Sequence, residues 1–438
     1  MVESAVLDAG RRDGQARPAW REVYVLGGLR GLSFAGDVMA ETAILLFLVK
    51  HGAAAYAVMA LLLAAAVPPA LLAPVAGAVA DRLDSRLVIT VVAALQALCC
   101  FAMVLWPSPV TLIALSVLLS AGLAFTHPVL AGLPRSMVGA ENVPRASSIS
   151  QTCAMAGMIA APALAGVLTS RFGIRIPLVI DGASFALVVA GGFVIKTRLH
   201  GSGQGRAAEH SAAEDAEKRQ ESTGEAETSA QESGPVYRVR SDRFLRSVLT
   251  MAGTVIACVS MANVFLVFYV TRTFGASGTT FGIIVSCEMV GLIIGGIAVG
   301  RIKRIRHEDI LIGSLLCLAV GVLGTGLSPG VWWIVPFYLI GGIGNGAMAT
   351  ELHIVLNLRV PDSHRGRGFA ALGAISNTAP AVGYLIAVLL LVALAPRYAF
   401  ICAGVAALLC VVAFSRPLLR RGEQAEAATE QAPTTDAA

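Results

Sequence analysis

Three charged side chains lie on one face of the first long apolar segment of the chain. Arg30, Asp37 and Glu41 are separated by seven and four residues, and these spacings place them on the same side of an α-helix. Charges inside a long apolar helix are costly, so we expect them to face an aqueous cavity or one another. Asp37, near the middle of the segment, could bind a proton or a cationic substrate. A structural Arg30–Asp37 ion pair between helices is the alternative.

Other polar side chains interrupt apolar segments further along the chain. Glu288 stands out because it is a lone carboxylate in an apolar stretch. Each of these residues could line a substrate or proton-coupling cavity, or could be packed and hydrogen-bonded in the interior. They are His127, Asn263, Glu288, Asn345 and Glu351.

The pattern of reactive residues disfavours an enzyme. No paired metal ligands and no nucleophile–base constellation converge on one level, so we predict neither catalytic residues nor a metal. The sequence has no phosphate-loop lysine motif and predicts no cofactor. The glycine-rich run Gly342–Gly346 looks like part of a dinucleotide-binding loop, but no strand precedes it, so we interpret it as a helix-packing surface.

The composition requires a membrane protein. Of the 438 residues, 56% are hydrophobic and only 14% are charged, and the mean hydropathy is +0.74. A helix needs about 20 apolar residues to cross the hydrocarbon core of a bilayer. The sequence predicts an all-α protein with twelve such spans, at residues 24–49, 54–80, 87–106, 109–133, 147–170, 174–195, 245–270, 278–300, 310–328, 331–357, 368–394 and 397–415.

The positive residues predict the orientation. Twelve spans place both termini on one side, and that side receives most of the Lys and Arg residues in the connecting segments. Only Lys50, Arg171, Arg175, Arg272 and Arg397 fall on the other side. Because positive loops stay in the cytoplasm, both termini are expected there, in a multi-pass protein of the bacterial cytoplasmic (inner) membrane. The net charge of +5 is then explained by the positive residues of the cytoplasmic segments, and no nucleic-acid partner is expected.

The chain divides into two similar halves. A glycine-rich helix end followed by clustered charge occurs at Gly77–Arg86 and again at Gly295–Arg304. The spacing from Gly77 to Pro162 nearly equals that from Gly296 to Pro380. We therefore expect two six-helix bundles with a site between them. The predicted domains are a cytoplasmic N-terminal segment (1–23), the first bundle (24–196), a disordered cytoplasmic linker (197–243), the second bundle (244–415) and a cytoplasmic tail (416–438).

The first of these loops resembles the signature between helices 2 and 3 of the major facilitator superfamily. Asp84 and Ser85 stand where that family usually has a second glycine. The resemblance implies twelve helices in two pseudo-symmetric bundles, and a loop that latches the halves together on the cytoplasmic side. The residues implied for this cytoplasmic gate are Gly77, Asp81, Arg82, Arg86 and Arg301.

The fifth span resembles the antiporter signature of the same superfamily, with two glycines replaced by alanine. Proline bends a helix and small residues allow close helix packing. The residues that carry this resemblance are Gly157, Pro162 and Gly166, with Pro380 as the counterpart in the second half. The fourth span lacks the arginine that drug:proton exporters commonly carry there.

The whole pattern resembles the bacterial branch that includes siderophore and macrolide exporters, on the cues Leu133–Arg135, Arg359–Pro361 and Arg365–Arg367. The resemblance implies a monomeric efflux protein in the lipid bilayer. It would export a small amphipathic metabolite, siderophore or antibiotic by proton antiport with alternating access, and so could confer antibiotic resistance. An importer or facilitator on the same fold is the first alternative. A membrane sensor or intramembrane enzyme is the second.

Overall fold

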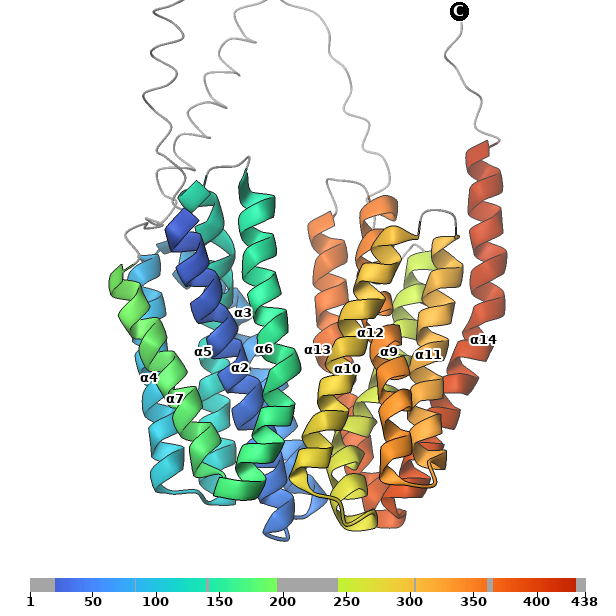
Figure 1. Ribbon diagram of the computed structural model, residues 1–438. Coiled ribbons are helices and arrows are strands. Elements are labelled where there is room, and N and C mark those ends of the chain that lie inside the picture. Colours follow the sequence, from blue (N-terminus) through green and yellow to red (C-terminus); the bar gives the residue numbers. More distant parts are fainter. Residues whose placement is uncertain are drawn as a thin grey trace, which may run out of the picture.

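The computed structural model describes residues 20–82, 84–138, 142–194, 243–302, 305–360 and 365–430, and this part of the chain is helical throughout (Figure 1). Twelve of the described helices are long and apolar enough to cross a membrane, which confirms the predicted twelve-span fold. They are α2 (Trp20–Lys50), α3 (Ala55–Arg82), α4 (Ser85–Leu105), α5 (Pro109–Val138), α6 (Val143–Phe172), α7 (Arg175–Val194), α9 (Arg243–Phe268), α10 (Gly278–Arg301), α11 (His307–Leu327), α12 (Ile334–Arg359), α13 (Arg365–Ala393) and α14 (Pro396–Glu430). Two short turns, η2 (Tyr269–Thr273) and η3 (Val331–Trp333), precede α10 and α12.

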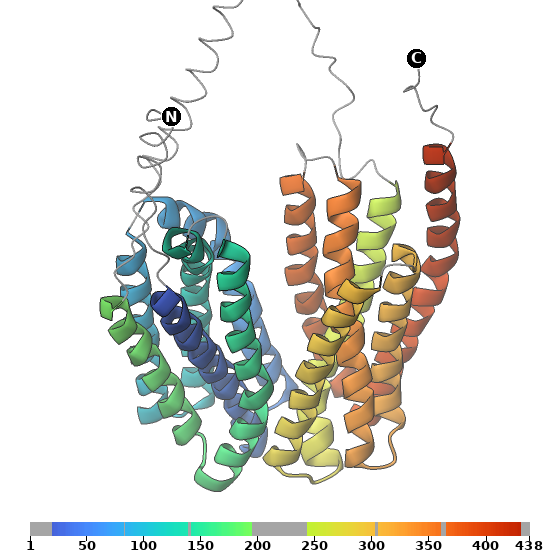
Figure 2. The same cartoon turned by 45° about the horizontal axis from the view of Figure 1, so that its top comes forward.

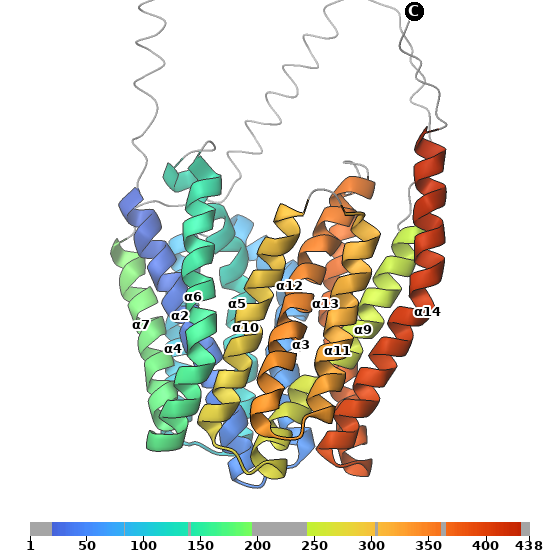
Figure 3. The ribbon, with the colours of Figure 1, turned by 45° about the vertical axis from the view of Figure 1, so that its right-hand side comes forward.

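The helices form two bundles with the same internal pairing. In the first bundle α2 packs on α6 and α7, α3 packs on α5, and α4 packs on α7. In the second bundle α9 packs on α13 and α14, α10 packs on α12, and α11 packs on α14. Figures 1 and 3 show the bundles side by side. This helix-by-helix correspondence is the structural counterpart of the repeat seen in the sequence.

The two bundles meet at one end and separate at the other (Figures 1 and 2). We call the end where α2 begins and α14 ends the open end, and the opposite end the closed end. At the closed end a single apolar cluster contains Leu48 and Leu61 of the first bundle together with Phe265 and Phe281 of the second. At the open end each bundle has its own cluster, with Val88 in one and Leu356 in the other. The hydrophobic contact that joins the halves therefore lies at the closed end.

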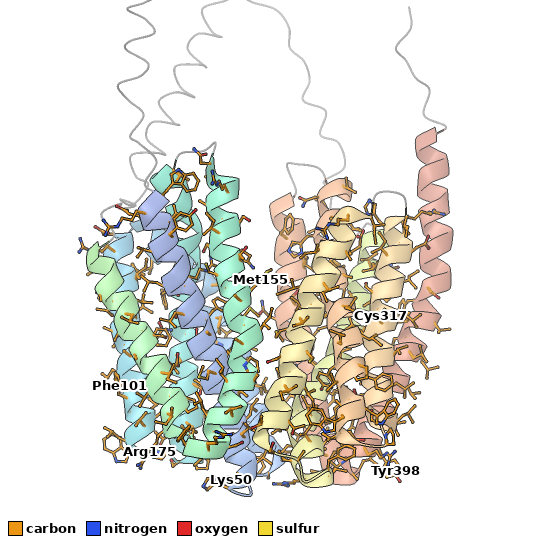
Figure 4. All side chains as sticks on the ribbon, in the orientation of Figure 1. Lys50, Phe101, Met155, Arg175, Cys317 and Tyr398 are labelled. Carbon is orange, nitrogen blue, oxygen red and sulfur yellow. The ribbon has the colours of Figure 1, made fainter. Side chains whose placement is uncertain are left out.

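Two helix pairs make most of this junction: α6 with α10 and α3 with α13. Arg272 adds a polar contact, because its Nη2 donates a hydrogen bond to the carbonyl of Ala53 at 3.1 Å. Lys50, Arg175 and Tyr398 also lie at the closed end (Figure 4). These include positive residues that the sequence assigns to the side opposite the termini.

Glycines bring α10 and α12 into backbone contact. A Cβ on Gly291 or Gly295 of α10 would collide with carbonyl oxygens of α12, and a Cβ on Gly342 or Gly346 of α12 would collide with those of α10. Small residues are what allow membrane helices to approach this closely. The interpretation of Gly342–Gly346 as a helix-packing surface is confirmed.

The last helix is longer than the sequence predicted. The span predicted to end at residue 415 matches the apolar part of this helix, Pro396–Ser415, but α14 continues to Glu430. Disorder was expected after Arg421; the helix extends beyond that point because Glu, Ala and Gln are good helix formers. The linker 197–243, apart from Arg243 at the start of α9, lies outside the described residues.

Candidate functional site

The first bundle encloses a cavity with carboxyl groups on two of its walls. The cavity has a volume of about 90 Å³ and lies between α2, α3, α5 and α7. Asp37 and Glu41 of α2 line it, and so does Asp181 of α7. The remaining lining residues are apolar or Ser, namely Ala40, Ile44, Leu61, Ala65, Ser116, Leu119, Ser120 and Leu123. Two of the residues predicted from one helical face thus share a cavity.

Asp181 is a member of this site that the sequence analysis missed. Its side chain is fully buried, and its Oδ2 accepts a hydrogen bond from Cys100 Sγ at 3.2 Å. Its other oxygen, Oδ1, has no hydrogen-bond partner among the described residues. The available signal was the same one that marked Glu288, a lone carboxylate within an apolar span.

Arg30 lies apart from the cavity. Its Nη1 donates a hydrogen bond to Ser150 Oγ of α6 at 3.3 Å, and Arg30 is not among the residues that line the cavity. In the described part of the chain the Arg30–Asp37 ion pair weighed as an alternative is not formed. The guanidinium instead ties α2 to α6.

The second bundle contains a larger cavity of about 310 Å³. Asn263 of α9, Glu288 of α10 and Asn345 of α12 line it, which brings together three of the predicted candidates. Tyr384 of α13 also lines it and lies within hydrogen-bonding reach of Asn263. Tyr384 is close enough to both Glu41 and Glu288 for their charges to act on its hydroxyl. This tyrosine therefore lies near carboxyl groups of both bundles.

Of the other two cavity candidates, only Glu351 has a described side chain. The side chain of His127, on α5, is outside the described residues. Glu351 is fully buried but does not line either cavity, because it points toward the start of α11. There its Oε1 lies 2.6 Å from Nδ1 of His307, near the open end. Glu351 thus holds α12 to α11, and nothing places it beside Glu288.

We expect replacement of His307 by Ala to destabilise the second bundle. Glu351 Oε2 already lacks a partner, so the variant would leave both oxygens of a buried carboxyl group unsatisfied. The cost should be about 1–3 kcal/mol. It can be measured as a lower thermal unfolding midpoint in detergent. His51→Ala is the matched control, because His51 is exposed, follows the end of α2, and has its described side-chain hydrogen bond and ring contact with Phe47, four residues away. Equal midpoints for both variants would contradict the assignment.

The loop of the predicted cytoplasmic gate is described only in part. Gly77, Asp81 and Arg82 lie on the last turns of α3, and their side chains are outside the described residues. The backbone N–H of Arg86 donates a hydrogen bond to Asp84 Oδ1 at 2.9 Å, so Asp84 caps the start of α4. The residue that replaces the family glycine therefore has a local structural role. Arg301 ends α10 and is exposed.

The helix with the antiporter-like pattern packs on both halves. Gly157 of α6 lies against the carbonyl of Gly31 on α2, within the first bundle. Gly166 and Pro162 face Gly278 and Gly282 of α10, across the junction. Next to the proline, the Ala163 N–H donates to Ser286 Oγ of α10 at 3.1 Å. Pro380, the counterpart on α13, lines the second cavity.

Two six-helix bundles, joined at one end and with polar cavities on the inner helices, are the architecture of a membrane transport protein that works by alternating access. The family model described as Major Facilitator Superfamily matches residues 26–261 and again residues 248–437. The chain belongs to the Major Facilitator Superfamily. It is therefore a multi-pass membrane protein of a transporter family.

Two similar proteins align with this chain over short segments. A putative metabolite transport protein, YwtG, of Bacillus subtilis (strain 168) is 27% identical over 121 residues, which are 27% of this chain and 26% of that protein. A gentisate transporter of Corynebacterium glutamicum (strain ATCC 13032) is 29% identical over 91 residues, 20% of each chain. The chain thus spans about a quarter of the first relative and a fifth of the second.

Solved structures share the fold over nearly the whole chain. The nucleoside transporter NupG has a TM-score of 0.72 at 12% identity, covering 90% of this chain and 98% of its own. A POT family transporter in complex with 5-aminolevulinic acid has a TM-score of 0.70 at 13% identity, covering 92% and 97%. A bacterial homologue of the human lysosomal transporter Spinster, in an inward-facing conformation, has a TM-score of 0.69 at 15% identity, covering 93% and 99%. At these identities the likeness shows the fold alone.

Proposed function

We propose that this chain is a secondary active exporter. It moves a small amphipathic metabolite, siderophore or antibiotic out across the bacterial cytoplasmic membrane in exchange for protons, as a monomer. The observation that carries the proposal is the cavity of the first bundle, where Asp37 and Glu41 meet on the inner side of α2. Carboxyl groups at membrane depth are the groups that bind and release protons in coupled transporters.

The orientation follows from the positive residues. The sequence places the sparse positive loops on the side of Lys50, Arg175 and Arg272, and these residues belong to the closed end. By the positive-inside rule the open end, with both termini, then faces the cytoplasm. The conformation is inward-open, in which cargo enters from the cytoplasm and protons leave to it.

Cytoplasmic closure should use the loop after α3 and its counterpart after α10. When the open end closes, the gate residues Gly77, Asp81, Arg82, Arg86 and Arg301 would come near the partner half. Asp81 could then stabilise the positive end of a facing helix. Import of a small metabolite on the same fold is the second candidate, and the partial similarity to a metabolite transport protein and a gentisate transporter supports a small metabolite as cargo in either direction.

Transport in membrane vesicles of opposite orientation tests the direction. Inverted vesicles with an acidic interior should accumulate the fluorescent amphiphile ethidium only when the protein is present, and an ionophore that dissipates the pH gradient should stop it. Right-side-out vesicles from the same cells provide the control. Faster uptake by right-side-out vesicles would support import and contradict the proposal.

A further inference from the structure

The carboxyl groups of the first cavity meet without a basic partner on its walls. Asp37, Glu41 and Asp181 line it, and none of its other described lining residues is Lys, Arg or His. Arg30, the basic residue nearest on the same helix face, is bonded to Ser150 instead. Like charges confined in one small, poorly hydrated space repel strongly, so the cavity favours an occupant that brings positive charge.

The packing of α7 on α2 positions Asp181. Gly36 immediately precedes Asp37 on α2, and a Cβ there would collide with Asp181 Oδ1 and lie 2.9 Å from Ser184 Oγ. The absence of a side chain at position 36 is therefore what lets the Asp181 carboxyl group sit against α2. Two helices, and not one, build this acidic wall.

Asp181 also has an acceptor that the described protein leaves unused. Cys100 donates to its Oδ2, whereas its buried Oδ1 has no partner. A buried acceptor without a donor is unfavourable, and such groups are rare in folded proteins. Because the described protein gives this carboxyl group only one hydrogen-bond donor, a positive charge in the cavity that Asp181 lines would stabilise it.

The size of the cavity limits what it can hold. Its volume of about 90 Å³ is smaller than the roughly 150 Å³ of an engineered protein cavity that binds benzene. A space of this size suits a small head group such as an ammonium group. The apolar lining from Ile44, Leu61 and Leu119 suits the carbon atoms next to such a group.

We propose that Asp37, Glu41 and Asp181 form a binding site for the ammonium head group of an amphipathic amine, and that protons compete for this site. The inference rests on the proposed function and deepens it, because it assigns the cargo to the class of protonated amines. Of the surrounding elements, α4 contributes Cys100 and α13 brings Tyr384 near Glu41, while α3 and α5 contribute no titratable lining group in the described part.

Equilibrium binding to the purified full-length protein tests the site without any gradient. Benzylammonium, benzyl alcohol and benzoate share one ring and differ in the charge of the head group. Benzylammonium should raise the thermal unfolding midpoint and release protons into a weakly buffered solution containing a pH indicator. Its affinity should fall as the pH is lowered, while the other two probes should have no such effect. Equal stabilisation by benzoate or benzyl alcohol would overturn the proposal.

Substitutions at Asp181 and Gly36 test whether benzylammonium binds at this cavity. Asp181→Asn keeps the shape of the side chain and should weaken benzylammonium binding by about ten- to a hundredfold, the range of one charge-assisted hydrogen bond. Gly36→Ala should weaken it similarly by displacing Asp181, whereas Gly28→Ala, on the same helix with nothing near its Cβ position, should bind as the parent does. If Gly36→Ala does not fold, Asp181→Asn decides. Unchanged affinity in Asp181→Asn would overturn the site.

Failure of this inference and failure of the proposed function are distinguishable. A protein that binds benzylammonium with proton release but performs no exchange against a pH gradient keeps the amine site and contradicts proton antiport. A protein that exports ethidium in exchange for protons but binds all three probes alike keeps antiport and contradicts the amine site.

Discussion

Replacement of Asp37 by Asn is expected to abolish accumulation driven by a pH gradient while leaving downhill exchange. Asn has nearly the same shape but cannot take up or release a proton. Asp37 lies on the wall of the acidic cavity, so the loss falls on the coupling step and not on the fold. For one proton exchanged, a gradient of about one pH unit supplies about 1.4 kcal/mol, which is about a tenfold accumulation. In the variant, the ratio of internal to external substrate concentration should stay near one.

Reconstituted vesicles give the measurement, with ethidium accumulation followed under an imposed pH gradient and then under an ethidium gradient alone. Glu22→Gln is the control, because Glu22 lies on the same helix in its first turn, at the open end. An Asp37→Asn protein that accumulates ethidium as the parent does would make this carboxyl group structural. Glu41 and Glu288 would then be the remaining candidates for coupling.

Gly282→Ala is expected to open the closed end. A Cβ at this position would collide with the carbonyl oxygen of Pro162, so α10 would have to move away from α6. Overpacking of this kind costs about 1–3 kcal/mol. Since the junction exists only when this end is closed, that cost shifts the equilibrium between the two conformations by about 5- to 150-fold toward the outward-open one.

Distances between spin labels at Arg175 and Tyr398 report this shift, because the two exposed residues mark opposite halves of the closed end (Figure 4). Labels introduced as unnatural amino acids avoid the eight native cysteines. The distance distribution should lengthen in Gly282→Ala. It should stay unchanged in Gly300→Ala, on the same helix, where nothing lies near the added Cβ. Identical distributions in both variants would show that this contact does not control closure.

The sequence predicts the fold well because the bilayer fixes how long each apolar segment must be. It also predicts that Asp37 and Glu41 lie on the same face of one helix, because their spacing of four residues determines this. Asp181 could not be placed beside them, because which helix packs at Gly36 depends on contacts between segments far apart in the chain. The partner of Glu351 could not be predicted for a related reason. Its depth in a helix is readable from the sequence, but the rotation of α12 that turns it toward His307 is not.

The glycine contacts between α10 and α12 have a consequence for how the second half moves. Backbones that touch at four glycines, two on each helix, leave no room for sliding, so the two helices should move as one rigid unit, which we call the lever. Glu288 and Asn345 sit on that lever, and the contact with Pro162 lies toward its other end. The Glu288–Asn345 side of the second cavity should therefore keep its dimensions through the transport cycle. Its width would change against the walls formed by α9 and α13, which carry Asn263 and Tyr384. Movement of the lever at the closed end would thus change the distance between Tyr384 and Glu288.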